Sequence, residues 1–212
     1  PTVRVGVCAV MGTWDVDGVT ALEITKALAG NTRPFLRTIG APYWAAGSMR
    51  QRLEVIIGYT RLQRYWCEKE NVELFTEGDA YPRPRYHTPA AYLEMYDMAL
   101  RADGGFDGIL KYMMDYTASP HYERGYVDRM ARNKPAYDWI EAHLSGGAAE
   151  GVDIICRHDR LRNADLPEGL TQGEINDLFF YSMAESLAAE TSLPFTFGTR
   201  SAHIVCGEDA RT

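Results

Sequence analysis

The chain has 212 residues, of which 46% are hydrophobic and 24% are charged, as in an ordinary globular protein with a sizeable core. Its formal net charge of -7 argues against nucleic acid or an anionic membrane surface as the main partner. No apolar run approaches the roughly 18–20 residues of a membrane span, and the opening PTVRVGVCAV has no signal-peptide pattern. The cysteines lack metal or redox spacing, so we expect buried thiols in a reducing cytoplasm.

Short apolar runs alternate with amphipathic stretches over the first two thirds of the sequence. The expected strands are residues 3–10, 33–40, 72–77 and 106–116, and the expected helices are 18–30, 49–68, 88–104 and 121–144. We expect Thr88 to cap the third helix, Gly30 and Gly104 to end helices, and Pro135 to break or restart the fourth helix. Strict alternation of strand and helix predicts a parallel α/β sheet with crossover helices.

A linker, LSGGAAEG (144–151), precedes a new pattern. Beyond it we expect strands at 152–157, 193–198 and 202–210 and a helix beginning near Thr171. These elements are too few to cover both faces of a parallel sheet. We therefore expect one domain over residues 1–147 and, over 148–212, the opening of a second α/β domain whose remainder is absent or supplied by another chain. Because the sequence does not begin with Met, we expect a processed chain or a piece of a longer protein.

Aromatic and ionisable side chains follow each of the first four strands, at the carboxyl ends where parallel α/β folds bind ligands. In chain order they are Trp14, Asp15, Asp17, Tyr43, Trp44, Glu77, Asp79, Tyr81, Arg83, Arg85, His87, Lys111, Tyr112, Asp115, Tyr116 and His121. Aromatic faces stack on the C–H surfaces of sugars, and planar charged groups bind hydroxyls in pairs. The combination therefore indicates a carbohydrate site.

Several of these residues also have a plainer explanation. Trp14, Tyr43 and Trp44 could simply pack under loops. Asp15 or Asp17 could cap the helix that follows, and Arg83 and Arg85 could form ion pairs on the surface. Of these residues, Glu77 is the one that a purely structural role explains least well. It ends the apolar run VELFTE beside Gly78, which permits close approach of a ligand, and the following Pro82 and Pro84 stiffen the loop. Such rigid positioning is what a catalytic carboxylate requires.

Three stretches, ELFTEGDAYPRPRY, ADGGFDGILKYMMDY and AAETSLPFTFGTRSAHIVCGEDAR, carry a resemblance to a known family. They resemble, in turn, the strand-seven region, the last barrel strand and the early trimerisation domain of β-galactosidase-like (β/α)8-barrel glycoside hydrolases. In that group the trimerisation domain is similar to class I glutamine amidotransferases. The resemblance implies four βα units from the second half of a TIM barrel, followed by part of a flavodoxin-like domain.

The resemblance also implies an activity in carbohydrate metabolism, namely a retaining glycoside hydrolase, or a fragment of one, that uses no cofactor and no metal. Glu77 takes the position of the nucleophile, and the substrate-binding positions are Trp14, Asp15, Tyr43, Trp44, Asp79, Tyr81, Arg83, Arg85 and Asp115. The family's general acid, a glutamate after the fourth strand, has no counterpart here because the chain begins at about the fifth strand in family order. Asp15 or Asp115 could approach Glu77 in its place.

Two other functions stay open. A half barrel with two open sheet edges would bind carbohydrate without catalysis and would pair with a second copy or a complementary chain. A metal-dependent sugar isomerase or lyase would use Glu77, Asp79, Asp115 and His87 as ligands, although the nearby arginines work against a cation. In each case we expect a cytoplasmic oligomer whose ligand is a carbohydrate.

Overall fold

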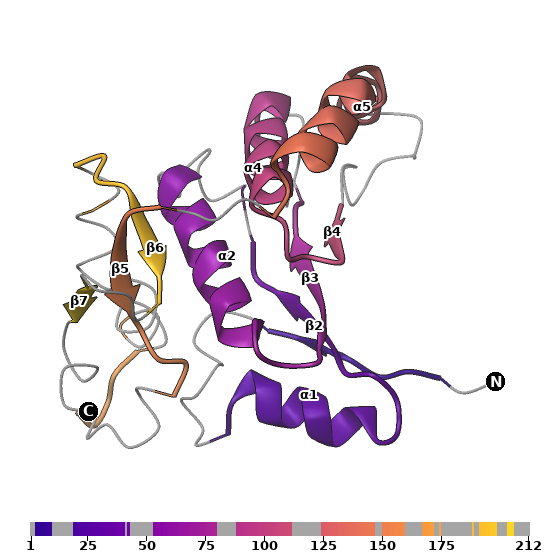
Figure 1. The fold of residues 1–212 in the computed structure, drawn as a ribbon. Helices are drawn as coiled ribbons and strands as arrows, with labels where there is room; N and C mark the ends of the chain where they lie inside the picture. Colours follow the sequence, from indigo (N-terminus) through magenta and orange to yellow (C-terminus); the bar gives the residue numbers. More distant parts are fainter. Residues whose placement is uncertain are drawn as a thin grey trace. The chain divides into compact units, whose positions relative to one another are not determined.

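The computed structural model describes residues 3–9, 19–40, 42, 53–79, 88–111, 124–146, 150–159, 167–171, 174, 188, 191–198 and 203–205. The described helices are α1 (Ala21–Ala29), α2 (Leu53–Cys67), α4 (Ala90–Asp103) and α5 (Gly125–Leu144) (Figure 1). The described strands are β1 (Val7–Cys8), β2 (Phe35–Thr38), β3 (Glu73–Glu77), β4 (Gly108–Leu110), β5 (Val152–Ile155), β6 (Phe195–Phe197) and β7 (His203–Val205). Within these ranges, no helix has the length and apolar character needed to cross a bilayer.

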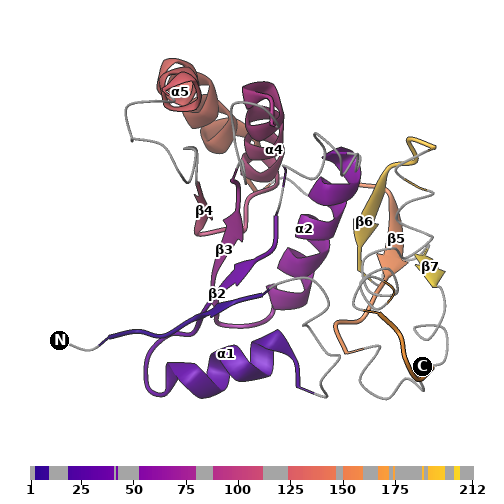
Figure 2. The ribbon, with the colours of Figure 1, turned by 180° about the vertical axis from the view of Figure 1, so that it is seen from behind.

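The strands form two sheets, which Figure 2 shows from behind. The first has the order β1-β2-β3-β4, so strands that follow one another in the chain are neighbours in the sheet. The pairs β1–β2 and β3–β4 are parallel. The second sheet has the order β6-β5-β7, and both of its pairs are parallel. The predicted α/β fold with parallel strands and crossover helices is thus confirmed.

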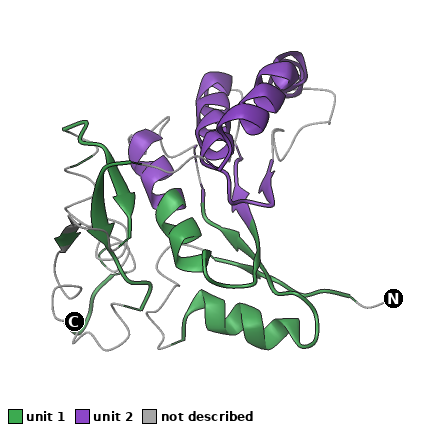
Figure 3. Ribbon diagram, viewed as in Figure 1, with its two compact units in different colours: residues 1–39, 61–74, 149–212 green, residues 40–60, 75–148 purple. Residues whose placement is uncertain are grey.

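Two compact units divide the chain (Figure 3). Unit 1 comprises residues 1–39, 61–74 and 149–212, and unit 2 comprises residues 40–60 and 75–148. Both α2 and β3 contribute residues to each unit. The predicted division into domains at 147/148 stays a prediction.

A capping box begins α1. The Thr20 Oγ1 accepts from the Glu23 backbone N–H at 3.2 Å, and the Glu23 carboxylate accepts from the Thr20 N–H at 2.7 Å. A cap of this kind stabilises a helix by about 1 kcal/mol. The helix ends, as predicted, at Gly30, whose φ of 55° suits glycine. The cap of α1 is therefore Thr20, and the expectation that Asp15 or Asp17 caps it is wrong; both lie outside the described residues.

In unit 1, the C-terminal half of α2 is held by side-chain bonds to backbone. The fully buried Gln63 amide donates to the Ile39 carbonyl at 2.8 Å and accepts from the Ile39 N–H at 3.1 Å. The Trp66 Nε1–H donates to the Cys156 carbonyl, just after β5, at 2.7 Å. Buried amide and indole groups are satisfied in this way, so they fix the helix without an energetic penalty.

Unit 2 has its core between α2, α4 and β4. Leu53 and Ile56 of α2 pack with Tyr96 and Leu100 of α4, and the half-buried Ile57, Phe106 and Ile109 pack around them. The buried residues of α4 are Leu93, Glu94, Tyr96, Asp97 and Leu100, a stripe with helical spacing. Figures 1 and 2 both show α5 beside α4. Leu93 and Tyr126 form the small apolar cluster at that contact.

Two further expectations about helix signals are corrected. The N-cap of α4 is Pro89, without a side-chain bond, and the Thr88 hydroxyl has no partner, so Thr88 does not cap the helix. Since α4 starts one residue later than expected, that hydroxyl is displaced from the first-turn N–H groups. Pro135 does not break α5, which is continuous. Pro135 lies on the exposed side of α5, so the backbone hydrogen bond that a proline lacks is missing on that side. Tyr126, before the proline in the chain, and Tyr137, after it, are the buried residues of the helix.

The remaining signals concern the cysteines and the C-terminal region. Cys67 and Cys156 are buried as expected, whereas Cys8 is exposed because it lies on the short strand β1 at the end of the sheet order.

The expected helix start near Thr171 agrees with a capping box there. Its two bonds are Thr171 N–H to the Glu174 carboxylate at 2.8 Å and Glu174 N–H to the Thr171 Oγ1 at 3.3 Å.

Candidate functional site

Glu77 ends β3, as the sequence predicts. In the register of the sheet Glu77 pairs with Leu110, the last residue of β4, so the two strands stop at the same edge. The Gly78 N–H donates to the Leu110 carbonyl at 2.8 Å, which carries the pairing one residue further. The backbone on both sides of the candidate nucleophile is thereby fixed to the neighbouring strand.

The side chain of Glu77 lies on the half-exposed face of β3. Leu74 and Thr76 are buried, and Thr76 faces α4 because its Oγ1 lies 3.1 Å from the Tyr96 hydroxyl. Successive residues of a strand point to opposite faces, so Phe75 and Glu77 point away from α4. Both are half-buried, and Leu110 is 47% exposed. A parallel sheet is normally covered on both faces, so this face of unit 2 is less covered than the fold requires.

Gly78 is required by close packing against β4. A Cβ at this position would lie 2.6 Å from the Ile109 Cγ2 and 3.0 Å from the Lys111 Nζ. The atoms that approach this glycine belong to the protein, and the predicted close approach of a ligand stays a prediction. Gly40, after β2, is also required, since a Cβ there would overlap the Glu77 carbonyl and the Tyr96 hydroxyl. Two glycines thus bring neighbouring backbone and side chains against the end of β3.

A chain of hydroxyl groups lies behind Glu77. The Tyr96 hydroxyl is 3.0 Å from the Thr60 Oγ1 and 3.1 Å from the Thr76 Oγ1. Because the Thr60 hydroxyl donates to the Ile56 carbonyl at 2.9 Å, the Tyr96 O–H donates to Thr60 and the Thr76 O–H donates to Tyr96. Burial raises the pKa of Tyr96, and the charges of Glu77 and Asp97 add to the effect. Tyr96 therefore stays protonated and ties α2, β3 and α4 together.

Lys111 and Asp97 form a buried ion pair beside this chain. The Lys111 Nζ contacts the Asp97 Oδ1; Asp97 is 0% exposed and Lys111 16% exposed. The Asp97 Oδ2 has no hydrogen-bond partner. Burial is the largest effect on both groups: it raises the pKa of Asp97 and lowers the pKa of Lys111, and the attraction between the two charges offsets part of each shift. The pair fixes the residue after β4 to the middle of α4.

Asp97 was not predicted to be a functional residue, and Lys111 was predicted only as one of the polar residues at the end of the fourth strand. A signal for the pair was present. Asp97 belongs to the stripe of Leu93, Tyr96 and Leu100, so it occupies a core position of the helix. A carboxylate at such a position needs a cation or hydrogen-bond donors. Lys111 is the cation that the fold supplies.

Glu77 and Asp79 are the predicted site residues that fall within the described ranges. Asp79 is 8% exposed, and it stands two residues beyond Glu77 in the same turn. The other predicted site residues are Trp14, Asp15, Tyr43, Trp44, Tyr81, Arg83, Arg85 and Asp115, and all lie outside the described residues. Their contacts with Glu77 stay predictions.

Among the residues that the structure describes, no group of three or more His, Cys, Asp or Glu side chains is arranged to hold a metal ion. Asp115 and His87 lie outside these residues, so the metal-dependent alternative stays untested. No protein-family model, curated protein or solved structure matches the chain. The residues themselves are therefore the basis for any functional assignment.

Proposed function

We propose that the chain is the C-terminal part of a retaining, β-galactosidase-like glycoside hydrolase in which Glu77 is the nucleophile. The observation that carries the proposal is the placement of Glu77. It ends a parallel strand, its side chain is on the face away from α4, and the backbone around it is fixed by the Gly78–Leu110 hydrogen bond. A nucleophilic carboxylate needs such fixed positioning at the carboxyl end of a strand.

The strand orders support the fold part of the proposal. In a (β/α)8 barrel each strand is the neighbour of the next along the chain, as in β1-β2-β3-β4. Doubly wound sheets, with orders such as 3-2-1-4-5-6 or 2-1-3-4-5, instead reverse direction within their first four strands. The order β6-β5-β7 places the first strand between the second and third, which is how a flavodoxin-like sheet begins. A half barrel followed by the start of a flavodoxin-like domain has both orders.

The proposed chemistry follows the two-carboxylate mechanism. A Glu77 carboxylate oxygen attacks the anomeric carbon while a second carboxyl protonates the departing oxygen, and water then hydrolyses the glycosyl-enzyme. Retention requires the two carboxyls about 5–5.5 Å apart. The first half of the barrel would supply the acid, as the resemblance implies, or Asp15 or Asp115 would do so.

A non-catalytic, carbohydrate-binding half barrel is the second candidate. It is favoured by the partial exposure of the face that carries Phe75, Glu77 and Leu110. In a closed barrel this face is interior and is covered by strands from the other half. A second copy or a complementary chain would cover it here.

The test is the hydrolysis of aryl β-glycosides by the Glu77→Gln variant of the full-length protein. Glu73→Gln is the matched control because Glu73 lies on the same face of β3 and makes an ion pair with Arg4 at 2.6 Å. We expect loss of hydrolysis in Glu77→Gln and near-normal activity in Glu73→Gln. Wild-type turnover in Glu77→Gln would exclude the nucleophile. Sugar binding without turnover by the wild-type protein would favour the second candidate.

A further inference from the structure

A cavity of about 620 Å³, widely open to solvent, lies between the N-terminal ends of α4 and α5 in unit 2. Its walls include Thr88 and Ala90 from the start of α4, and Gly125, Arg129 and Arg132 from α5. Both helices follow strands of the first sheet, so their N-terminal ends lie at the carboxyl ends of β3 and β4. In parallel α/β folds that is the side on which ligands bind.

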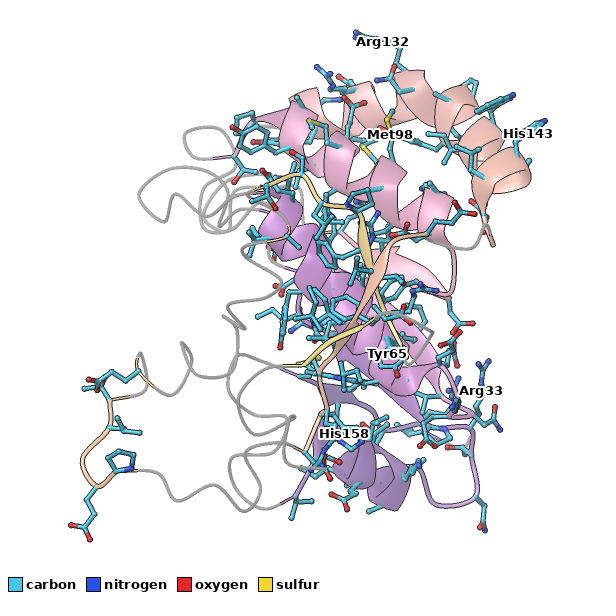
Figure 4. All side chains as sticks on the ribbon, turned by 60° about the vertical axis from the view of Figure 1, so that its left-hand side comes forward. Arg33, Tyr65, Met98, Arg132, His143 and His158 are labelled. Atoms are coloured by element: carbon cyan, nitrogen blue, oxygen red, sulfur yellow. The ribbon has the colours of Figure 1, made fainter. Side chains whose placement is uncertain are left out.

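The charge on the cavity wall is positive. The charged residues among its lining are Arg129 and Arg132. The Arg129 Nε contacts the Glu94 carboxylate, which also accepts from Asn133 and, at 2.8 Å, from the Tyr137 hydroxyl. This network fixes the Arg129 guanidinium and neutralises part of its charge. Arg132 has no ion pair or hydrogen bond within the described residues, and Figure 4 shows its side chain extending outward from α5.

The wall also presents hydrogen-bond donors that lack acceptors. Thr88 is 2% exposed, it lines the cavity, and its hydroxyl has no partner. The α4 N-terminus has neither a side-chain cap nor an acidic residue in its first turn, so the positive end of its dipole is not neutralised. The Tyr92 N–H already donates to the Pro89 carbonyl at 2.9 Å, so the first-turn donors open to a ligand are the N–H groups of Ala90 and Ala91. In α5, by contrast, Asp128 of the first turn makes an ion pair with Arg124 at 3.1 Å.

We propose that this cavity binds a phosphate-class oxyanion, independently of the function proposed for Glu77. An oxyanion would accept hydrogen bonds from the Thr88 hydroxyl, from the first turn of α4 and from Arg132, whose planar guanidinium matches the geometry of phosphate. The volume lies within the range of about 300–1,000 Å³ typical of small-molecule sites. It exceeds the needs of a bare ion, so it can also hold the rest of a phosphorylated small molecule.

The test is calorimetric titration of the whole chain at low ionic strength with inorganic phosphate, glucose 6-phosphate and glucose. We expect saturable binding of both phosphate compounds and none of glucose. Tighter binding of glucose 6-phosphate would assign the site to phosphorylated small molecules, and equal or tighter binding of inorganic phosphate would assign it to free phosphate. Absence of saturable binding by either phosphate compound overturns the proposal.

Three single-residue variants test whether the phosphate compounds bind at this cavity. Arg132→Ala should weaken phosphate binding about tenfold, as expected for loss of a charge-assisted hydrogen bond. The matched control is Lys134→Ala on the same helix, because Lys134 is exposed and pairs with Asp138 at 2.6 Å, away from the cavity lining. Thr88→Val should weaken binding several-fold without lowering the unfolding temperature, since the hydroxyl has no partner in the protein. Equal losses in Arg132→Ala and Lys134→Ala would show non-specific attraction and overturn the assignment.

Discussion

Lys111, the residue after β4, makes an ion pair with Asp97 in the middle of α4, and both side chains are largely buried. The Lys111 Nζ would lie only 3.0 Å from a Cβ at Gly78, so the pair is beside the turn that follows Glu77. A buried pair of this kind is costly to break from one side only, because one uncompensated charge remains. The pair therefore makes the end of β3 and the position of Glu77 sensitive to substitutions on α4.

Lys111→Met should destabilise the protein by about 3–5 kcal/mol, because Asp97 is left buried without its cation. The free energy of unfolding from urea titrations measures the effect. Lys134→Met is the control: it breaks the exposed pair with Asp138, which contributes only about 0.3–0.5 kcal/mol. A loss in Lys111→Met as small as that of the control would contradict a structural role for the buried pair.

Replacement of both partners should have the opposite outcome. The Asp97→Leu/Lys111→Met double variant should equal or exceed the wild type in stability at pH 7, since an apolar pair avoids the cost of burying two charges. Because the native pKa of Asp97 is raised, the folded protein binds more protons than the unfolded chain above pH about 4. The stability of the wild type relative to the double variant should therefore fall as the pH rises through this window.

On the alkaline side, the native pKa of Lys111 is lowered, so the folded protein binds fewer protons there than the unfolded chain. The relative stability of the wild type should therefore rise again as the pH approaches about 10.4. Urea titrations of both proteins at a series of pH values measure the two limbs. A difference in unfolding free energy that does not change with pH would rule out this explanation.

Tyr96→Phe should cost about 1–3 kcal/mol of stability, because the phenol bridges Thr60 and Thr76 in a fully buried chain of hydroxyls. Tyr92→Phe, on the same helix, makes the same chemical change at a half-exposed position and should stay within about 0.5 kcal/mol of the wild type. Thermal and urea unfolding compare the two variants. Equal stabilities of the two variants would show that the hydroxyl chain contributes nothing.

Cys8 should react with iodoacetamide in the native protein at neutral pH, whereas Cys67 should not. Cys8 is exposed. Burial, followed by the charge of Glu70, raises the pKa of Cys67 to about 12, so the thiolate that reacts is almost absent. Peptide mass mapping after a timed reaction distinguishes the two, with urea-unfolded protein as the control in which both react. Rapid native labelling of Cys67 would contradict its burial.

The alternation of strands and helices was predictable, because each element has its own hydrophobic period and helix-end signals such as Gly30 and Gly104 are local. Glu77 was predictable as a strand end for the same reason. The Asp97–Lys111 pair was not predicted, although its acid interrupts an apolar stripe, because the sequence does not show which cation the folded chain brings to it. The position of Thr88 relative to the cap of α4 depends on a one-residue shift in the helix start, which sequence patterns do not resolve.

The most direct test of the central proposal is mass spectrometry of the full-length protein after incubation with a 2-deoxy-2-fluoro-β-galactoside that carries a good leaving group. Such a substrate forms the glycosyl-enzyme but hydrolyses slowly, so the nucleophile keeps the label. The proposal predicts one added fluoroglycosyl group on the peptide that contains Glu77, with the same label in Glu73→Gln and none in Glu77→Gln. A label on any other carboxylate, or a label that persists in Glu77→Gln, would contradict it.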